Sequence, residues 1–214
     1  MIKAIFWDND GVLVDTEHLY FEATRRVLAR VGVDLTPALH HELFLVQNRG
    51  AWHLAEAAGV APDSLARLRA DRDALYDELL GRDGLAIPGV ETALERLAPR
   101  HRMAIVTSSH RDHFDTIHRG TGLLRFFDFV LTREQYQRSK PDPEPYLAAL
   151  ARTGLDRSEC LVIEDSERGL RAARAAGLAC WVIPTALTRG SDFRAADRVL
   201  GAVADVVTEL AGMG

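Results

Sequence analysis

From residue 88 onward, short apolar runs alternate with segments of helical periodicity. The apolar runs lie at residues 103–106, 129–131, 160–163 and 179–183, and residues 2–6 form a similar run at the start of the chain. Strands that pair in parallel need a crossover connection between them, and a helix usually supplies it. The sequence therefore predicts an α/β fold in which helices cover both faces of a parallel sheet.

Residues 16–87 lack this alternation. Apolar residues recur there at helical spacing, as in Leu65, Leu68, Leu75 and Leu79. No convincing strand pattern occurs in this block, so we expect an all-helical insertion. The predicted organisation is a catalytic core built from residues 1–15 and 88–214, with a helical cap domain at residues 16–87. Inserted after the first strand, the cap would stand as a lid over the carboxyl edge of the sheet.

Composition excludes several classes of partner. The chain has 214 residues, of which 47% are apolar, which is enough for one substantial core and a smaller domain. Its formal net charge is −5 and it contains no basic run, so we expect no nucleic acid partner. No apolar stretch approaches the roughly 20 residues that span a bilayer, and no leader pattern precedes the first strand. We expect a cytoplasmic monomer, with Cys160 and Cys180 as buried packing groups.

Polar residues stand where the predicted strands end. Asp8 and Asp10 follow the first strand, and Thr107 and Ser108 follow the run at residues 103–106. The other two positions are Lys140, after the next strand and its connection, and Glu164 with Asp165. Ligands of open α/β sheets bind outside the carboxyl ends of the strands, so we expect these side chains to meet at one edge.

This set of residues suits phosphoryl transfer. Asp8 would act as nucleophile and metal ligand, and Asp10 as proton donor and acceptor. Carboxylates of Asp8 and Asp165 can hold a hard cation such as Mg²⁺. Lys140 would offset the negative charge of nucleophile and phosphate, while Thr107 and backbone N–H groups would bind the phosphate oxygens by donating hydrogen bonds to them. Each residue also has an ordinary structural explanation, but four strand ends that converge favour the chemical one.

The same residues occur as four ordered motifs over essentially the whole chain. On these motifs the chain resembles the haloacid dehalogenase-like superfamily, in the helical-cap branch that includes β-phosphoglucomutase and sugar-phosphate phosphatases. The resemblance implies a Rossmann-like core. The matching segments are Asp8-Asn9-Asp10-Gly11-Val12-Leu13-Val14-Asp15-Thr16, then Thr107-Ser108, then Ser139-Lys140-Pro141-Asp142-Pro143, and finally Glu164-Asp165-Ser166 with Gly169.

The resemblance also implies a role for each residue. Asp8 would become an aspartyl phosphate, and Asp10 would protonate the leaving oxygen and then activate water. Family dehalogenases lack the second aspartate, so Asp10 favours phosphate chemistry. The implied Mg²⁺ ligands are Asp8, the Asp10 carbonyl, Asp165 and, through water, Glu164. The implied phosphoryl-binding groups are Thr107, Lys140, and the backbone near Ser108 and Asn9.

Three functions remain open. A Mg²⁺-dependent phosphatase acting on a small phosphomonoester, most naturally a sugar phosphate, is preferred over a β-phosphoglucomutase-like phosphomutase. The mutases typically carry a histidine where this chain has Tyr20. A non-catalytic phosphate-binding module is the third interpretation. Loss of Asp8 or Asp10 would mark such a module, and this chain has both residues. In the cap, Arg49 could grip the far end of a substrate, or it could cap the preceding helix.

Overall fold

The computed structural model describes residues 1–47, 49–81 and 84–213. Asn48, which adjoins Arg49 in the predicted cap, lies outside the described residues. The chain divides into two compact units, one formed by Met1–Asp15 with Gly84–Gly214 and the other by Thr16–Asp83. The sequence places the domain boundaries after residues 15 and 87.

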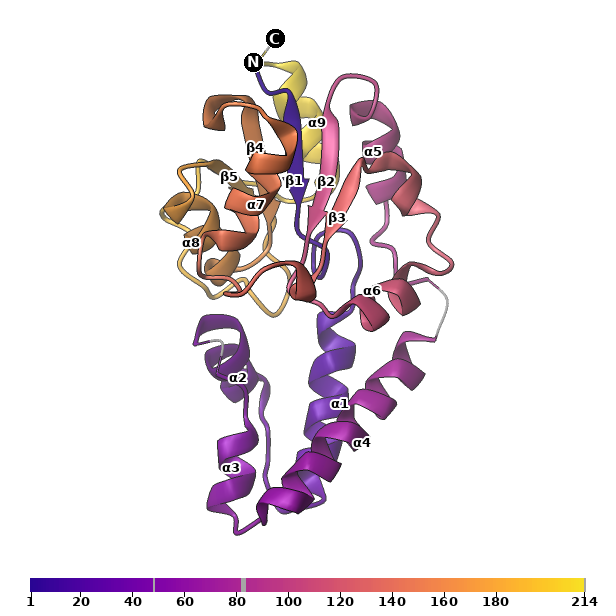
Figure 1. Cartoon of the computed structure of the whole chain (residues 1–214), viewed down its shortest axis with the longest axis vertical. Helices are drawn as coiled ribbons and strands as arrows, with labels where there is room; N and C mark the ends of the chain where they lie inside the picture. Colours follow the sequence, from indigo (N-terminus) through magenta and orange to yellow (C-terminus); the bar gives the residue numbers. More distant parts are fainter. Residues whose placement is uncertain (48, 82–83, 214) are drawn as a thin grey trace. The chain divides into compact units, whose positions relative to one another are not determined.

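The first unit is built on a six-stranded sheet in the order β3-β2-β1-β4-β5-β6, and every pairing is parallel (Figure 1). The strands are β1 (Ala4–Trp7), β2 (Arg102–Val106), β3 (Phe129–Leu131), β4 (Cys160–Glu164), β5 (Ala179–Val182) and β6 (Arg198–Val199). The first strand in the sequence lies in the middle, between β2 and β4. The chain runs from β1 to β2 and β3 on one side and then crosses to β4 on the other side. Such a switch point opens a crevice at the carboxyl edge of the sheet.

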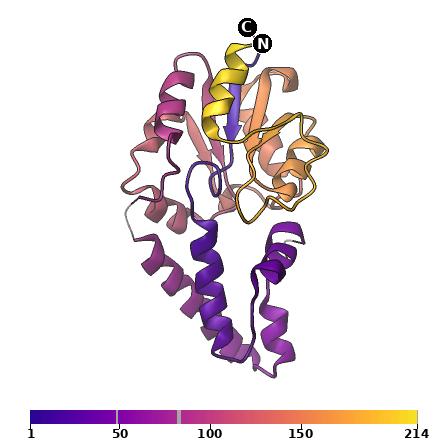
Figure 2. The same ribbon diagram turned by 180° about the vertical axis from the view of Figure 1, so that it is seen from behind.

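Helices cover both faces of this sheet. Figure 1 shows α7 (Glu144–Thr153) in front of the strands, and the reverse view in Figure 2 shows α9 (Val203–Ala211) in front. With α8 (Glu167–Ala175), α7 covers the core that contains Phe6. On the other side α5 (Val90–Leu97) packs against α9. All residues of β1 and β4 are buried, which explains why their sequences are continuous apolar runs. The α/β prediction is confirmed.

Some boundaries differ from the predicted ones. Helix α6 (Arg111–His118) is short: Arg119 is its C-cap, and Gly122, in a left-handed conformation with φ of 66°, begins the 3-10 turn at Leu123–Phe126. The apolar segment near the C-terminus forms α9 (Val203–Ala211). Strand β6 was not anticipated, since both of its residues are exposed and it has no apolar run. Both cysteines are buried and unpaired, as predicted.

The second unit is helical. Its helices are α1 (Glu17–Ala29), α2 (Pro37–His40), a π-helical turn at His41–Val46, α3 (Trp52–Ala57) and α4 (Pro62–Leu80). The hydroxyl of Thr36 accepts from the backbone N–H of Leu39 at 3.2 Å, so Thr36 is the N-cap of α2, and Pro37 follows it in the first turn. Helices α1 and α4 pack against each other, and the second unit has its own apolar core that includes Leu28, Leu35 and Leu65.

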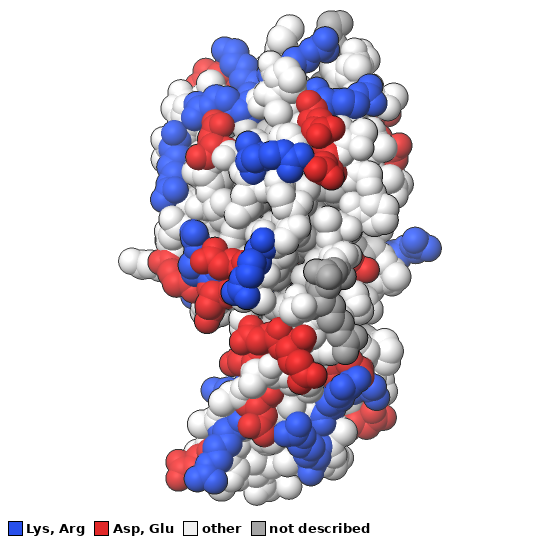
Figure 3. Space-filling model, turned by 90° about the vertical axis from the view of Figure 1, so that its right-hand side faces the viewer, with Lys and Arg blue, Asp and Glu red and all other residues white. Residues whose placement is uncertain are grey.

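The distribution of charged side chains on the surface agrees with the lack of a basic run in the sequence. On the face drawn in Figure 3, acidic and basic side chains are interspersed. Among the described residues, no helix is both long enough and apolar enough to cross a membrane.

Candidate active site

Asp8 is held at the carboxyl edge of the sheet by the strand that precedes it. Its backbone N–H donates to the carbonyl of Ile163 at 2.9 Å, which extends the β1–β4 pairing by one residue. The chain then turns back, because the Asn9 carbonyl accepts from the N–H groups of Leu13 at 2.8 Å and Val14 at 3.1 Å. The turn places Asp8 at the sheet's switch point and carries Asp10 to the side.

Gly11 is required in this turn for two reasons. Its φ of 82° lies in the left-handed region, which side-chain-bearing residues rarely adopt. A Cβ added there would lie 2.4 Å from Oδ2 of Asp165. The turn after β1 therefore packs directly against the Asp165 carboxylate at the end of β4.

Lys140 joins the two acidic strand ends. Its Nζ donates to Oδ1 of Asp8 at 2.7 Å, to Oε1 of Glu164 at 2.7 Å and to the carbonyl of Val106 at 2.8 Å. The side chain is almost wholly buried. Burial on its own would lower the pKa of Lys140, but the charges of Asp8 and Glu164 outweigh it and raise that pKa. Lys140 is therefore a fixed positive charge beside Asp8.

Glu164 is the most enclosed member of the group, with none of its surface exposed. Its Oε1 also accepts from the Tyr146 hydroxyl at 2.6 Å, and its Oε2 accepts from the Ser166 hydroxyl at 3.0 Å. A Cβ added to Gly169 would lie 1.9 Å from this carboxylate, so only glycine leaves room for it. These donors, with Lys140, overcome the effect of burial and lower the pKa of Glu164.

The pKa of Asp8 is shifted in the opposite direction to that of Glu164. Burial first, and the nearby Glu164 charge second, raise the pKa of Asp8 from 3.8 to about 7, although Lys140 opposes the rise. The two carboxylates share one lysine, and Glu164 has the additional donors. Of the two carboxylates, Asp8 is therefore the one whose negative charge is less fully stabilised by nearby donors.

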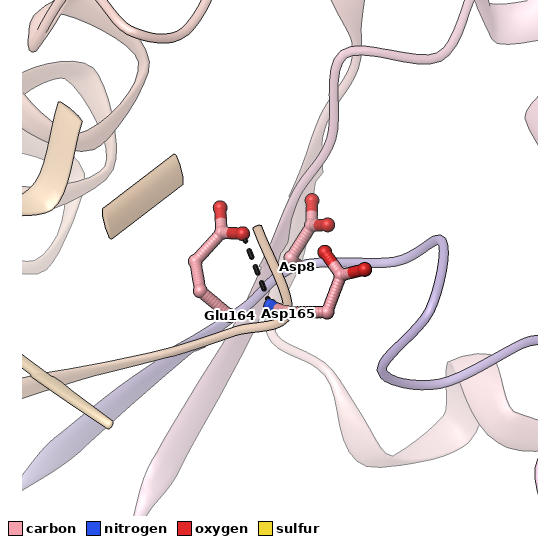
Figure 4. A group of neighbouring side chains, drawn as sticks. All are labelled: Asp8, Glu164 and Asp165. Carbon is pink, nitrogen blue, oxygen red and sulfur yellow. Dashed lines mark hydrogen bonds between the residues drawn. The ribbon is translucent and has the colours of Figure 1, made fainter. Parts of the chain in front are cut away.

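Asp8, Glu164 and Asp165 together form a candidate metal site. Each offers one carboxylate oxygen, and these oxygens lie within 4.8 Å of one another. Figure 4 shows the Asp8 and Asp165 carboxylates next to each other, while Glu164 curls back to accept from the Asp165 N–H at 3.3 Å. A buried set of three carboxylates with a single lysine suits a hard divalent cation in both ligand type and charge.

Asp10 lies against the end of β2. Its Oδ2 accepts from the Ser109 hydroxyl at 2.7 Å and from the Thr107 hydroxyl at 3.3 Å. Thr107 Oγ1 in turn accepts from the Ser109 N–H at 3.0 Å. The hydroxyl groups of Ser108 and Ser139 are 3.0 Å apart, which joins the second and third motifs. The predicted residues of all four strand ends are thus in contact, although their chemical roles stay predictions.

Four further polar residues of the site were missed from the sequence: Ser109, His118, Tyr146 and Ser166. Ser109 follows Thr107-Ser108 directly and Ser166 belongs to the quoted fourth motif, so their positions were a usable signal. Tyr146 and His118 lie on helices α7 and α6, whose registers relative to the strand ends cannot be read from spacing.

Arg49 and Tyr20, which the sequence assigns to the predicted cap, lie in the second unit. The backbone N–H of Arg49 donates to the carbonyl of Leu43 at 2.8 Å, and its side chain is exposed. Tyr20 packs edge-on against Phe44 and Tyr76, and Arg72 donates to its hydroxyl. Tyr20 thus has packing partners within its own unit.

Known proteins resemble this chain along most of its length. A family model for haloacid dehalogenase-like hydrolases matches residues 2–177. A phosphorylated carbohydrates phosphatase from Thermotoga maritima is 36% identical over 183 residues, covering 83% of this chain and 82% of the relative.

Solved structures agree. The crystal structure of CbbY from Rhodobacter sphaeroides in complex with phosphate is 27% identical, with a TM-score of 0.79 and 96% coverage of both chains. A β-phosphoglucomutase from Clostridium difficile shares the fold at 19% identity, with a TM-score of 0.82 and coverage of 100% of this chain and 96% of the other. The resemblance inferred from the four motifs is confirmed, as is the prediction of a hydrolase. The chain belongs to the haloacid dehalogenase-like hydrolase family.

Proposed function

We propose that this protein is a Mg²⁺-dependent phosphatase that hydrolyses a small phosphomonoester, a sugar phosphate, through an aspartyl phosphate on Asp8. The observation that carries this proposal is the contact between Lys140 and Asp8, 2.7 Å, beside the Asp165 carboxylate at the sheet's switch point. A carboxylate nucleophile must approach a phosphate that is also negative. It therefore needs positive charge next to it, and Lys140 would supply part of that charge.

Mg²⁺ is the cation that we propose for the acidic site. Asp8, Asp165 and the backbone carbonyl of Asp10 would hold it directly, and Glu164 would act through water. The cation would supply positive charge to the phosphoryl oxygens. The three carboxylates and Lys140 together leave about two negative charges, which one divalent cation would balance.

Asp10 is proposed as the general acid and base. Its carboxylate is oriented by Ser109 and Thr107, and it stands two residues from the nucleophile. It would donate a proton to the leaving oxygen as the bond to phosphorus breaks, and would later take a proton from the attacking water. The backbone at Asn9 and Ser108, together with Thr107 and Lys140, would bind the phosphoryl oxygens.

The substrate class is proposed from the relatives, since one of them is named a phosphorylated carbohydrates phosphatase. Residues 16–87 would form the cap domain that encloses the substrate, and exposed Arg49 would bind a distal anionic group of it. A cytoplasmic location and a monomeric state stay predictions from the sequence.

The test is phosphate release from a panel of sugar and short-chain phosphomonoesters, with Mg²⁺ or with EDTA. We expect metal-dependent release from a few sugar phosphates. Asp8→Asn should abolish it while leaving the circular dichroism spectrum unchanged, because an amide cannot form the acyl phosphate. Asp192→Asn, which alters an exposed carboxylate, is the matched control and should keep wild-type activity.

Other outcomes would contradict the proposal. Wild-type activity in Asp8→Asn would remove the assigned nucleophile. Formation of a sugar phosphate isomer without phosphate release would identify a phosphomutase. Binding of phosphomonoesters without either reaction would identify a binding module.

A further inference from the structure

A buried histidine lies beside the catalytic loop and has no part in the chemistry proposed above. His118, the last residue of α6, is only 5% exposed, and its ring packs against Phe114 with 4.4 Å between ring centroids. Its Nε2 lies 2.7 Å from Oδ1 of Asn9, which is fully buried between Asp8 and Asp10. Burying two polar side chains costs free energy unless hydrogen bonds satisfy them. We therefore ask which hydrogen bonds His118 and Asn9 make.

The direction of each hydrogen bond follows from Asp10. Nδ2 of Asn9 lies 3.4 Å from Oδ2 of Asp10, an oxygen that also accepts from the Ser109 and Thr107 hydroxyls. The amide nitrogen of Asn9 therefore faces Asp10, and its oxygen faces His118. That arrangement requires a proton on Nε2 of His118. Nδ1 is then the acceptor, and the Thr121 hydroxyl, 3.0 Å away, can donate to it, since its other acceptor, the His118 carbonyl, is farther away at 3.4 Å.

The resulting series of donors runs one way, from Thr121 through His118 and Asn9 to Asp10. It needs a neutral imidazole, with one donor nitrogen and one acceptor nitrogen. Burial supplies this condition, because it lowers the pKa of His118 to about 4, although Asp10 and Asp115 oppose the shift. His118 is thus uncharged at neutral pH.

We propose that His118 is a positioning residue for Asp10: its Nε2–H fixes the Asn9 amide, which helps to orient the Asp10 carboxylate for proton transfer. The inference rests on the proposed function, in which Asp10 is the general acid and base. Asn9 supplies a donor to Oδ2 of Asp10 in addition to the hydroxyls of Ser109 and Thr107. Without the histidine donor, Oδ1 of Asn9 would be buried and unsatisfied, and the amide would rotate to find another partner.

The test compares two substrates whose leaving groups differ in their need for an acid. A sugar phosphate releases an alkoxide that must be protonated, whereas acetyl phosphate releases acetate, which leaves as a stable anion. His118→Phe keeps an aromatic ring but removes both nitrogens. We expect it to lower kcat/KM for the sugar phosphate about tenfold or more, and for acetyl phosphate less than about twofold.

His118→Gln is the matched variant, because its side-chain amide can place a donor near the position of Nε2. It should restore kcat/KM for the sugar phosphate to within about threefold of wild type. An equal loss on both substrates would indicate a purely structural role and overturn the proposal. No loss in His118→Phe, or a glutamine variant no better than phenylalanine, would overturn it as well.

A second measurement needs no folded variant of the buried site. In wild-type protein with ¹⁵N-labelled histidine, long-range ¹H–¹⁵N spectra at neutral pH should show His118 as the Nε2–H tautomer. An Nδ1–H tautomer or a charged ring would break the series of donors and refute the inference. If wild-type protein hydrolysed neither ester, the proposed function would fail, and this spectrum would still test the hydrogen bonds separately.

Discussion

Asp8→Asn should stabilise the metal-free protein while it destroys activity. In the folded protein the pKa of Asp8 is raised from 3.8 to about 7, chiefly by burial. An unfolded chain ionises this group near its ordinary pKa, so between these two values the folded state binds more protons than the unfolded state. Stability therefore falls as pH rises through this window, and the whole penalty is present above the folded-state pKa.

The size of the effect follows from the shift. Each pKa unit corresponds to about 1.4 kcal/mol, so a shift of about three units gives at most roughly 4 kcal/mol. Asparagine resembles the protonated acid and carries no charge, which removes the penalty. Its side-chain oxygen can still accept from Lys140, and Lys140 keeps Glu164 as its counter-ion. We expect a gain of about 2–4 kcal/mol near pH 8, and little gain near pH 4.

Urea unfolding in EDTA at both pH values measures this difference, with the m-value as a check on the folded state. Asp192→Asn is the control, because Arg194 holds the pKa of Asp192 at about 2, below its ordinary value. That variant should show no gain at either pH. The reasoning is refuted if Asp8→Asn is no more stable than wild type near pH 8, or if its gain is the same at both pH values.

Two further predictions concern the groups around Glu164. Tyr146→Phe removes a hydroxyl that donates to a buried carboxylate and should cost about 1.5–3 kcal/mol, whereas Tyr136→Phe removes a donor to the Thr107 carbonyl and should cost about 0.5–1.5 kcal/mol. Urea unfolding measures the loss of stability in each variant. If Tyr146→Phe lost no more stability than Tyr136→Phe, the conclusion that Glu164 is ionised would be wrong. Gly169→Ala should displace Glu164 from Lys140, destabilise the protein by about 1–3 kcal/mol and lower kcat more than tenfold. Gly120→Ala, where an added Cβ meets nothing within 4 Å, should be close to neutral in the same assays, and a similar loss in both variants would contradict this reading.

The sequence was most informative where the rules of a parallel sheet apply. Apolar runs identified β1 to β5, and the carboxyl ends of parallel strands must share an edge, so Asp8, Thr107 and Asp165 could be brought together without coordinates. Helix ends were also readable where a single residue decides them. Gly154 closes α7 with φ of 66°, as a glycine after an apolar helix predicts.

Contacts that depend on helix register could not be predicted. His118 and Asn9 are 109 positions apart in the sequence, and their meeting depends on how α6 packs beside the loop after β1. Neither residue has a periodicity that marks it. Strand β6 could not be predicted for a different reason. It has only two residues, both exposed at the edge of the sheet, so the sequence there has no pattern of buried positions. For α9, β-branched residues such as Val203 and Val206 suit a strand as well as a helix.

The place of β1 in the sheet also governs when this protein can acquire its fold during synthesis. β1 is made first, but its two neighbours are β2, which begins at Arg102, and β4, which begins at Cys160. The helical unit is continuous in sequence and can form its internal contacts much earlier. A chain released before β4 would expose one edge of β1, an apolar strand, and would be prone to aggregate. Premature termination should thus yield aggregated or degraded fragments rather than a partly active enzyme.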